Sequence, residues 1–292
     1  MKLSTRTTIH AWLMVLPACA LLAMFTHIPI VTTIWHSFHS TPKPRRPSRF
    51  VGLDNYRDML ADPIFWKSLV NNLVYALTSV PISVALALTM ALFVNSKLRG
   101  KGFLRMAYFT PTVLPMIAVA NIWLFFYNPQ YGLLAAALKP FGITGINWLG
   151  SQDTALWALI AVAIWKEAGF FMIFYLAALQ QIPTDLREAA AIEGASRWTY
   201  FWRITFPLLM PTTLFVLVNA VINAFRLVDH IFVMTGGGPD NATSVLLFQI
   251  YVAGFKFFDQ AQAATLSVVL LAILFLIAIG QFMFADKKVH YQ

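Results

Sequence analysis

Several side chains that could bind a polar solute stand inside long apolar stretches of this sequence. They are Asn121, Trp165, Glu167, Asn219, Asn223 and Arg226. Amide and carboxyl groups can hydrogen-bond to the hydroxyl groups of a sugar, and aromatic rings can stack on its C–H faces. Asn219 and Asn223 are four residues apart and share one face of a helix, which Arg226 continues three residues later.

Two interpretations of these polar residues remain open. A polar group is costly in a hydrocarbon environment, so it can mark a solute path. The same group can instead form hydrogen bonds between helices that only hold a bundle together. Lys166 and Glu167 are adjacent, and therefore project to different sides of a helix.

The composition predicts the elements that must position these residues. Only 11% of the 292 residues are charged and 59% are apolar, whereas a soluble domain has about 25% charged residues. The apolar windows lie at 11–34, 69–94, 106–127, 155–178, 207–232 and 261–284. At about 1.5 Å per residue each can cross about 30 Å of hydrocarbon, where only helices satisfy their own backbone. The sequence predicts an all-α integral membrane protein, with residues 1–292 forming one domain of six transmembrane helices.

The basic residues favour an orientation with both termini in the cytoplasm. The net charge is +9, and the basic residues lie mostly in loops and tails. The short loop 96–105 contains Lys97, Arg99, Lys101 and Arg105 and no acidic residue, which is typical of an inner loop. The sequence lacks the basic stripe interleaved with aromatics that a nucleic-acid-binding domain would show.

The inner loop 179–206 has the composition of a helix that presses against another protein. Thr184 or Asp185 can cap its N-terminus, and Glu188 in the first turn would interact favourably with the helix dipole. Three alanines follow, which combine high helix propensity with little bulk, and Gly194 permits a sharp turn. The residues alone leave open an ordinary amphipathic connector.

A second helix is expected after this turn. Trp198, Phe201, Trp202 and Phe206 give it an apolar side that can lie at the membrane interface. Pro207 then opens the fifth window, where proline is tolerated at a helix start.

The spacing of this loop resembles the signature loop of permeases from binding-protein-dependent ABC importers. Glu188-Ala189-Ala190, Gly194 and Pro207 fit the pattern, and Glu193 stands where the family usually has an acidic residue. The resemblance implies a type I importer permease architecture. In it, Glu188, Ala189, Ala190, Glu193 and Gly194 belong to a coupling helix that docks on a cytoplasmic ATPase.

A second match follows the fifth window. Thr235-Gly236-Gly237-Gly238-Pro239, with Tyr251, Phe255 and Asp259 downstream, resembles the carbohydrate-uptake branch of the family, the maltose and glycerol-3-phosphate type. The segment 51–56 also resembles that branch, and a short helix is expected near 54–61. The resemblance implies that Thr235, Gly237, Gly238 and Pro239 face a solute-binding protein.

The resemblance also implies what this chain needs from its partners. The sequence has no Gly-x-x-x-x-Gly-Lys-Ser/Thr loop, since Gly100-Lys101 lacks the upstream glycine and the following hydroxyl. ATP hydrolysis is therefore expected in other subunits, and this chain is not expected to be an enzyme. The resemblance implies that two ATP-binding cassette subunits bind the ATP and Mg²⁺. A second homologous permease and an extracytoplasmic solute-binding protein complete the expected complex in the lipid of the bacterial inner membrane. No nucleic acid, metal or cofactor is expected on this chain itself.

The transported solute is left open among an oligosaccharide, a glycoside, a polyol and a glycerophosphate. A proton-coupled secondary transporter is the alternative function. It would place paired carboxylates in mid-membrane and usually shows internal repeats, and neither is clear in this sequence. A membrane enzyme is disfavoured because the six histidines are scattered.

Overall fold

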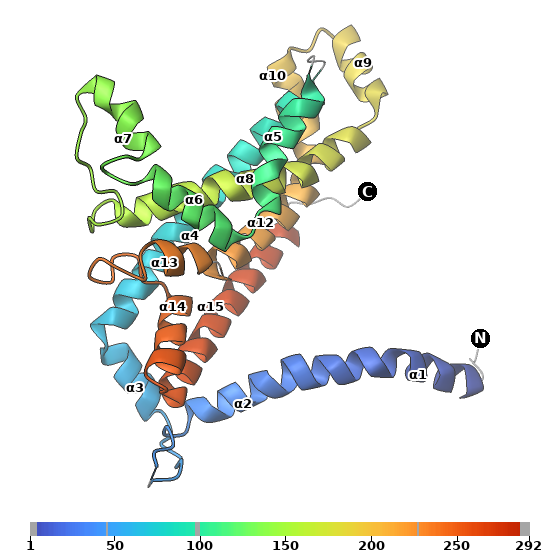
Figure 1. The fold of residues 1–292 in the computed structure, drawn as a ribbon. Helices are drawn as coiled ribbons and strands as arrows, with labels where there is room; N and C mark the ends of the chain where they lie inside the picture. Colours follow the sequence, from blue (N-terminus) through green and yellow to red (C-terminus); the bar gives the residue numbers. More distant parts are fainter. Residues whose placement is uncertain (1–4, 45, 97–99, 227, 287–292) are drawn as a thin grey trace. The chain divides into compact units, whose positions relative to one another are not determined.

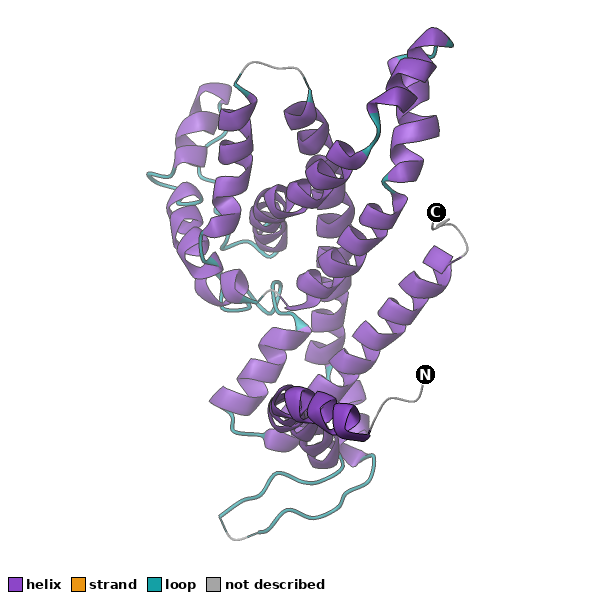
Figure 2. Ribbon diagram, turned by 90° about the vertical axis from the view of Figure 1, so that its right-hand side faces the viewer, coloured by secondary structure: helices purple, strands orange, loops and turns teal. Residues whose placement is uncertain are grey.

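The computed structural model describes residues 5–44, 46–96, 100–226 and 228–286. Within these ranges the chain folds into helices joined by loops (Figure 2). Isolated β-bridges join His39 to Phe50 and Lys43 to Arg46. The α-helices (Figure 1) are α1 (Thr5–Leu22), α2 (Ile28–Ser37), α3 (Asp54–Ala61), α4 (Pro63–Asn95), α5 (Lys101–Val113), α6 (Met116–Phe126), α7 (Leu133–Leu138), α8 (Ala155–Gln181), α9 (Thr184–Ile192), α10 (Arg197–Tyr200), α11 (Phe206–Leu208), α12 (Met210–Arg226), α13 (Asp229–Met234), α14 (Leu246–Tyr251) and α15 (Gln260–Asp286). The predicted all-α class is confirmed.

Five of the predicted windows form helical stretches long and apolar enough to cross a membrane. They are Trp12–Ser37, Pro63–Asn95, Ala155–Gln181, Met210–Met234 and Gln260–Gln281. Each begins or ends within a few residues of the predicted window. Lys97 and Arg99, which support the predicted orientation, lie outside the described residues.

The third window, 106–127, is a bent pair of helices instead of one helix. α5 and α6 meet at an angle of 103°. Between them Leu114 is extended, with φ −74° and ψ 137°, and Pro115 precedes the first turn of α6. Proline drives the residue before it toward extended backbone and has no N–H to continue the helix. The predicted total of six spans therefore holds when this pair counts as one span.

The chain divides into two compact units by its internal contacts. The first comprises residues 1–63 and 249–272, and the second comprises residues 64–248 and 273–292. The single domain over 1–292 stays a prediction.

In the first unit, polar side chains of α3 fasten it to the end of α2. Asn55 Nδ2 donates to the carbonyls of Ser37 (2.8 Å) and His39 (3.0 Å). Ser37 Oγ and the Tyr56 hydroxyl lie 2.7 Å apart. α3 is the short helix predicted near 54–61.

The start of α15, also in the first unit, is capped by Asp259. Its Oδ1 accepts a hydrogen bond from Gln262 N at 3.0 Å, and its carboxyl group also accepts one from the Thr41 hydroxyl. Thr41 Oγ1 accepts from Ala261 N at 2.9 Å. Asp259 therefore has a structural role at the start of the last span.

The core of the second unit includes an inward face of α4 that is built from small residues. Ser79, Ser83, Ala87 and Ala91 recur at every fourth position and are buried. Small side chains let helix backbones approach closely, which is the usual basis of helix packing in membranes.

A close approach of the same kind occurs between α5 and α8. A Cβ placed on Gly169 would lie 2.1 Å from the Tyr108 carbonyl oxygen and 3.1 Å from Thr112 Cγ2. The absence of a side chain at this position therefore brings the two backbones together.

Gly169→Ala is expected to destabilise the protein by about 1–3 kcal/mol, because the added methyl group would separate α5 from α8. Gly280→Ala is the matched control: Gly280 also lies in a helix, but a Cβ there meets open space. That change should be neutral or slightly stabilising. Thermal unfolding of the purified protein in detergent measures both, and equal unfolding temperatures would contradict a tight contact at Gly169.

Candidate functional site

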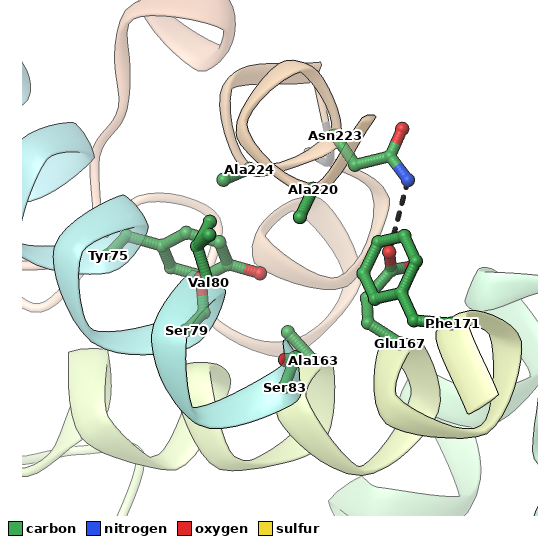
Figure 3. Close-up of a pocket in the computed structure, with 10 residues that line it drawn as sticks. All are labelled: Tyr75, Ser79, Val80, Ser83, Ala163, Glu167, Phe171, Ala220, Asn223 and Ala224. Carbon is green, nitrogen blue, oxygen red and sulfur yellow. Dashed lines mark hydrogen bonds between the residues drawn. The ribbon is translucent and has the colours of Figure 1, made fainter. Parts of the chain in front are cut away.

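A polar crevice lies in the second unit where α4, α8 and α12 meet (Figure 3). Its walls are Tyr75, Ser79, Val80 and Ser83 from α4, Ala163, Glu167 and Phe171 from α8, and Ala220, Asn223 and Ala224 from α12. The three helices thus bring hydroxyl, carboxyl and amide groups to one place. These groups can donate and accept hydrogen bonds to a hydroxylated solute.

Two hydrogen bonds organise the crevice. Asn223 Nδ2 donates to Glu167 Oε2 at 3.0 Å, which joins α12 to α8 (Figure 3). The Tyr75 hydroxyl lies 3.2 Å from His230 Nε2, which joins α4 to α13. Tyr75 and His230 are buried, so their bond lies inside the core, whereas Glu167 and Asn223 are half-buried.

The crevice is narrow. The space open to water in it is about 10 Å³, which is close to what one water molecule requires. A sugar is many times larger. The helices must therefore separate before such a solute can enter.

Glu167 and Asn223 are the predicted path residues that the structure brings together. Sequence reasoning missed the α4 wall, Tyr75, Ser79 and Ser83. Their spacing of four residues places three hydroxyl groups on one helix face, and that pattern was the available signal.

The other predicted path residues lie elsewhere. Asn121 and Asn219 each donate to the carbonyl one turn earlier in their own helix, at 2.8 Å and 2.7 Å. The Trp165 ring packs edge-on against Trp123 at 5.6 Å, and Arg226 is exposed at the end of α12. The role of these residues in a solute path stays a prediction.

The loop between α13 and α14 is fastened to the start of α4. Asn71 Nδ2 donates to the carbonyls of Asn241 (3.0 Å) and Ser244 (2.8 Å). Asn72 Oδ1 accepts from Leu246 N at 2.9 Å. Amides at this end of the span therefore hold a loop in place.

The same loop is also bonded internally. Thr235 Oγ1 and Thr243 Oγ1 lie 2.8 Å apart, and Thr243 donates to the Gly238 carbonyl at 2.7 Å. Gly237 has φ +84° and is buried, and a Cβ there would lie 2.6 Å from the Phe248 ring. The loop is therefore a closed turn with defined packing.

The predicted partner-facing residues of this loop differ in exposure. Thr235, Gly238 and Pro239 are half-buried and Gly237 is buried, whereas Gly236 and Asp240 are exposed. Asp240 pairs with Lys67 at 3.2 Å. The partner role of the loop stays a prediction.

The inner loop forms the predicted helix with a different start. Pro183 precedes the first turn of α9, so neither Thr184 nor Asp185 is the cap, and Asp185 takes the first-turn position expected for Glu188. After Glu193, Gly194 adopts φ +73° as predicted, with bonds from Gly194 N to Ala191 O (3.1 Å) and from Ala195 N to Ala190 O (2.9 Å). This pair of bonds is a Schellman motif, which ends the helix sharply.

The surface of this loop exposes apolar side chains. Among the predicted coupling residues Ala190 is buried, and Glu188, Ala189, Glu193 and Gly194 are exposed. Ile192 is 89% exposed, and Trp198 in α10 is 71% exposed. α9 and α10 lie together at one end of the second unit (Figure 1). Apolar side chains exposed in this way would be covered by a partner or by the membrane interface, and the coupling role of the loop stays a prediction.

A cleft of about 580 Å³ separates α9 and α10 from the ends of α4 and α8. Arg187, Arg197 and Tyr200 are among its lining residues. α9 is joined to α8 directly, with only Ile182 and Pro183 between the two helices.

Known proteins resemble this chain in sequence and in fold. The family described as the binding-protein-dependent transport system inner membrane component matches residues 65–288. The chain belongs to this family. It is therefore a multi-pass inner-membrane permease component of an ABC importer whose ATP hydrolysis resides in separate subunits, and a proton-coupled secondary transporter is no longer the alternative.

Individual relatives match most of the permease. It is 39% identical to the trehalose/maltose transport system permease protein MalF of Thermococcus litoralis, over 87% of each chain. It is 35% identical to the sn-glycerol-3-phosphate transport system permease protein UgpA of Agrobacterium fabrum, over 96% of each. A chain of a bacterial ABC transporter involved in alginate import superposes with a TM-score of 0.84 over 98% of both chains at 22% identity. The last comparison confirms the importer-permease fold.

Gly237→Ala is expected to destabilise the loop between α13 and α14 more than Gly236→Ala. Both positions have positive φ, which costs a residue with a side chain about 1–2 kcal/mol. A methyl group on Gly237 would additionally press on Phe248, whereas one on Gly236 meets open space. Limited proteolysis of the loop and thermal unfolding measure the difference. Equal effects of the two changes would contradict the packing role of Gly237.

Proposed function

We propose that this permease imports a neutral sugar or a sugar-like polyol. The observation on which this rests is the crevice, where Glu167 and Asn223 face hydroxyl-bearing side chains of α4. None of the described residues that line it is cationic. An acidic side chain without a cation in the crevice disfavours an anionic solute such as a glycerophosphate. The 39% identical relative is named for trehalose and maltose transport, which agrees with this choice.

The proposed complex contains a second homologous permease, two ATP-binding cassette subunits that bind ATP and Mg²⁺, and an extracytoplasmic solute-binding protein. Both termini and the loop 179–206 lie on the cytoplasmic side, and the loop between α13 and α14 faces the binding protein. The exposed apolar residues of α9 and α10 support docking of this end on an ATPase.

Closure of the ATPase subunits would displace α9, and α8 would follow. Only Ile182 and Pro183 separate these helices, and proline restricts the backbone between them. The movement would reach Glu167 and change its position relative to Asn223. Opening of the crevice would then be coupled to ATP hydrolysis.

The solute class is tested by ATPase activity of the assembled complex in lipid with its binding protein. Maltose, trehalose, a simple polyol and sn-glycerol-3-phosphate are compared. Stimulation by a neutral sugar or polyol is expected, and stimulation by the phosphate alone would overturn the proposal.

Glu167→Gln is expected to slow solute uptake by about 5-fold, because a hydrogen bond to a charged group is worth about 1 kcal/mol more than a neutral one. The amide retains an acceptor for Asn223, so the helices should stay packed. Thr89→Ala is the control, since the Thr89 hydroxyl donates to Ala85 O in its own helix at 2.8 Å and is exposed. Uptake by reconstituted vesicles measures both, and wild-type uptake by Glu167→Gln would exclude the crevice from the path.

Ile192→Glu is expected to abolish copurification of the ATPase subunits without changing the stability of the isolated permease. A charge on a side chain already 89% exposed costs the chain little alone, but would be buried at the proposed interface. Phe141→Glu is the matched control, because Phe141 is 78% exposed at the end of the 3-10 helix Lys139–Phe141 that follows α7. Retention of the ATPase by both variants would refute docking at α9.

A further inference from the structure

The break between α5 and α6 creates a specific problem for a membrane helix. The last carbonyl groups of an α-helix have no partner within the helix, and hydrocarbon offers no water to replace one. α5 ends at Val113 and α6 leaves it at 103°. Unpaired carbonyl groups at this bend would destabilise the bent pair.

The side chain of Lys166 on α8 meets these carbonyl groups. Its Nζ donates to Pro111 O at 3.0 Å, to Thr112 O at 3.3 Å and to Leu114 O at 2.6 Å. An ammonium group has three donors, and all three are engaged here. Its positive charge also stands at the negative end of the α5 dipole.

The approach of α8 makes this contact possible. Gly169 lies three residues after Lys166, on the same face of α8, and its missing side chain lets that face reach Tyr108 O. Lys166 is half-buried. α8 therefore matches the break between α5 and α6 in shape, through Gly169, and in charge, through Lys166.

The helix beyond the break connects to the crevice. α6 packs against α13, whose His230 bonds to Tyr75 in the crevice wall. The far end of α6 is tied to α8, because the Tyr127 hydroxyl donates to Ala158 O at 2.9 Å. Glu167, the neighbour of Lys166, bonds to Asn223 on α12. On α8, Lys166 thus bonds to the break between α5 and α6, and its neighbour Glu167 lines the crevice.

We propose that Lys166 is a positioning residue for transport: its ammonium group fixes the angle between α5 and α6 and thereby the position of α6 and α13 beside the crevice. Lys166 does not bind the solute in this proposal. The inference rests on the proposed function, since the crevice is taken as part of the solute path.

The geometry is tested by distance measurement in the assembled complex in lipid. Spin labels are placed at Phe103 on α5 and Ile122 on α6, both exposed, in a Cys19→Ser background. A single narrow distance distribution is expected for the wild type. Lys166→Met, which keeps length without charge or donors, should broaden it, and Lys166→Arg should restore it. This measurement needs no solute, so an error in the proposed solute class would leave its result intact.

Transport by the same variants separates positioning from solute contact. Lys166→Met is expected to lower the maximal uptake rate at least 10-fold and to leave the half-saturating solute concentration within 2-fold, with Lys166→Arg keeping about a third of the rate. An unchanged distance distribution with a raised half-saturating concentration would assign Lys166 to the solute instead and overturn the proposal.

Lys166→Gln covers the case in which Lys166→Met does not assemble. Its amide keeps two donors without a charge, so the distance distribution should broaden less than in Lys166→Met and uptake should fall. A wild-type distance distribution in whichever uncharged variant assembles would overturn the proposal.

Discussion

Every backbone polar group within hydrocarbon needs a partner inside the protein, and this constraint decides where a span of this permease can bend. The bend at Leu114 and Pro115 is possible because Lys166 accommodates the carbonyl groups that α5 leaves unpaired. A lysine in a span is costly when isolated. Here the Lys166 ammonium group donates hydrogen bonds to the free carbonyl groups at the end of α5. These bonds offset both the free-energy cost of a lysine within the span and that of the broken helix.

The same constraint separates the polar residues of the spans into two kinds. Asn71 and Asn72 satisfy backbone groups of the loop between α13 and α14, and they serve as fasteners. Glu167 and Asn223 bond to each other beside the crevice, and their remaining hydrogen-bonding capacity is the basis of the proposed solute contact. The hydrogen bond between Glu167 and Asn223 joins two helices, as one of the two interpretations predicts, and the solute-path role of this pair stays a proposal.

Features that depend on local physics could be predicted from the sequence. Apolar length located the spans, the segment near 54–61 formed its helix, and Gly194 adopted the expected positive φ. Pro115 was a local signal for a break in the third span, but the partner of the freed carbonyl groups could not be predicted, because Lys166 lies 52 residues from Leu114 along the chain. The α4 wall of the crevice was missed for a related reason. Hydropathy along the sequence locates a transmembrane helix, but the face of that helix that is buried depends on the helices packed against it.

The continuity of α8 gives this arrangement a mechanical consequence. α8 runs from Ala155 to Gln181 without a proline, and holds the break, the crevice and the connection to α9 along one helix. α12, by contrast, follows a π-helical turn at Phe201–Thr205 and a short helix that contains Pro207. A displacement of the inner loop would therefore move α8 more nearly as a rigid body than α12. The bond between Glu167 and Asn223 joins these two helices, so it lies where their unequal movement would first open the crevice.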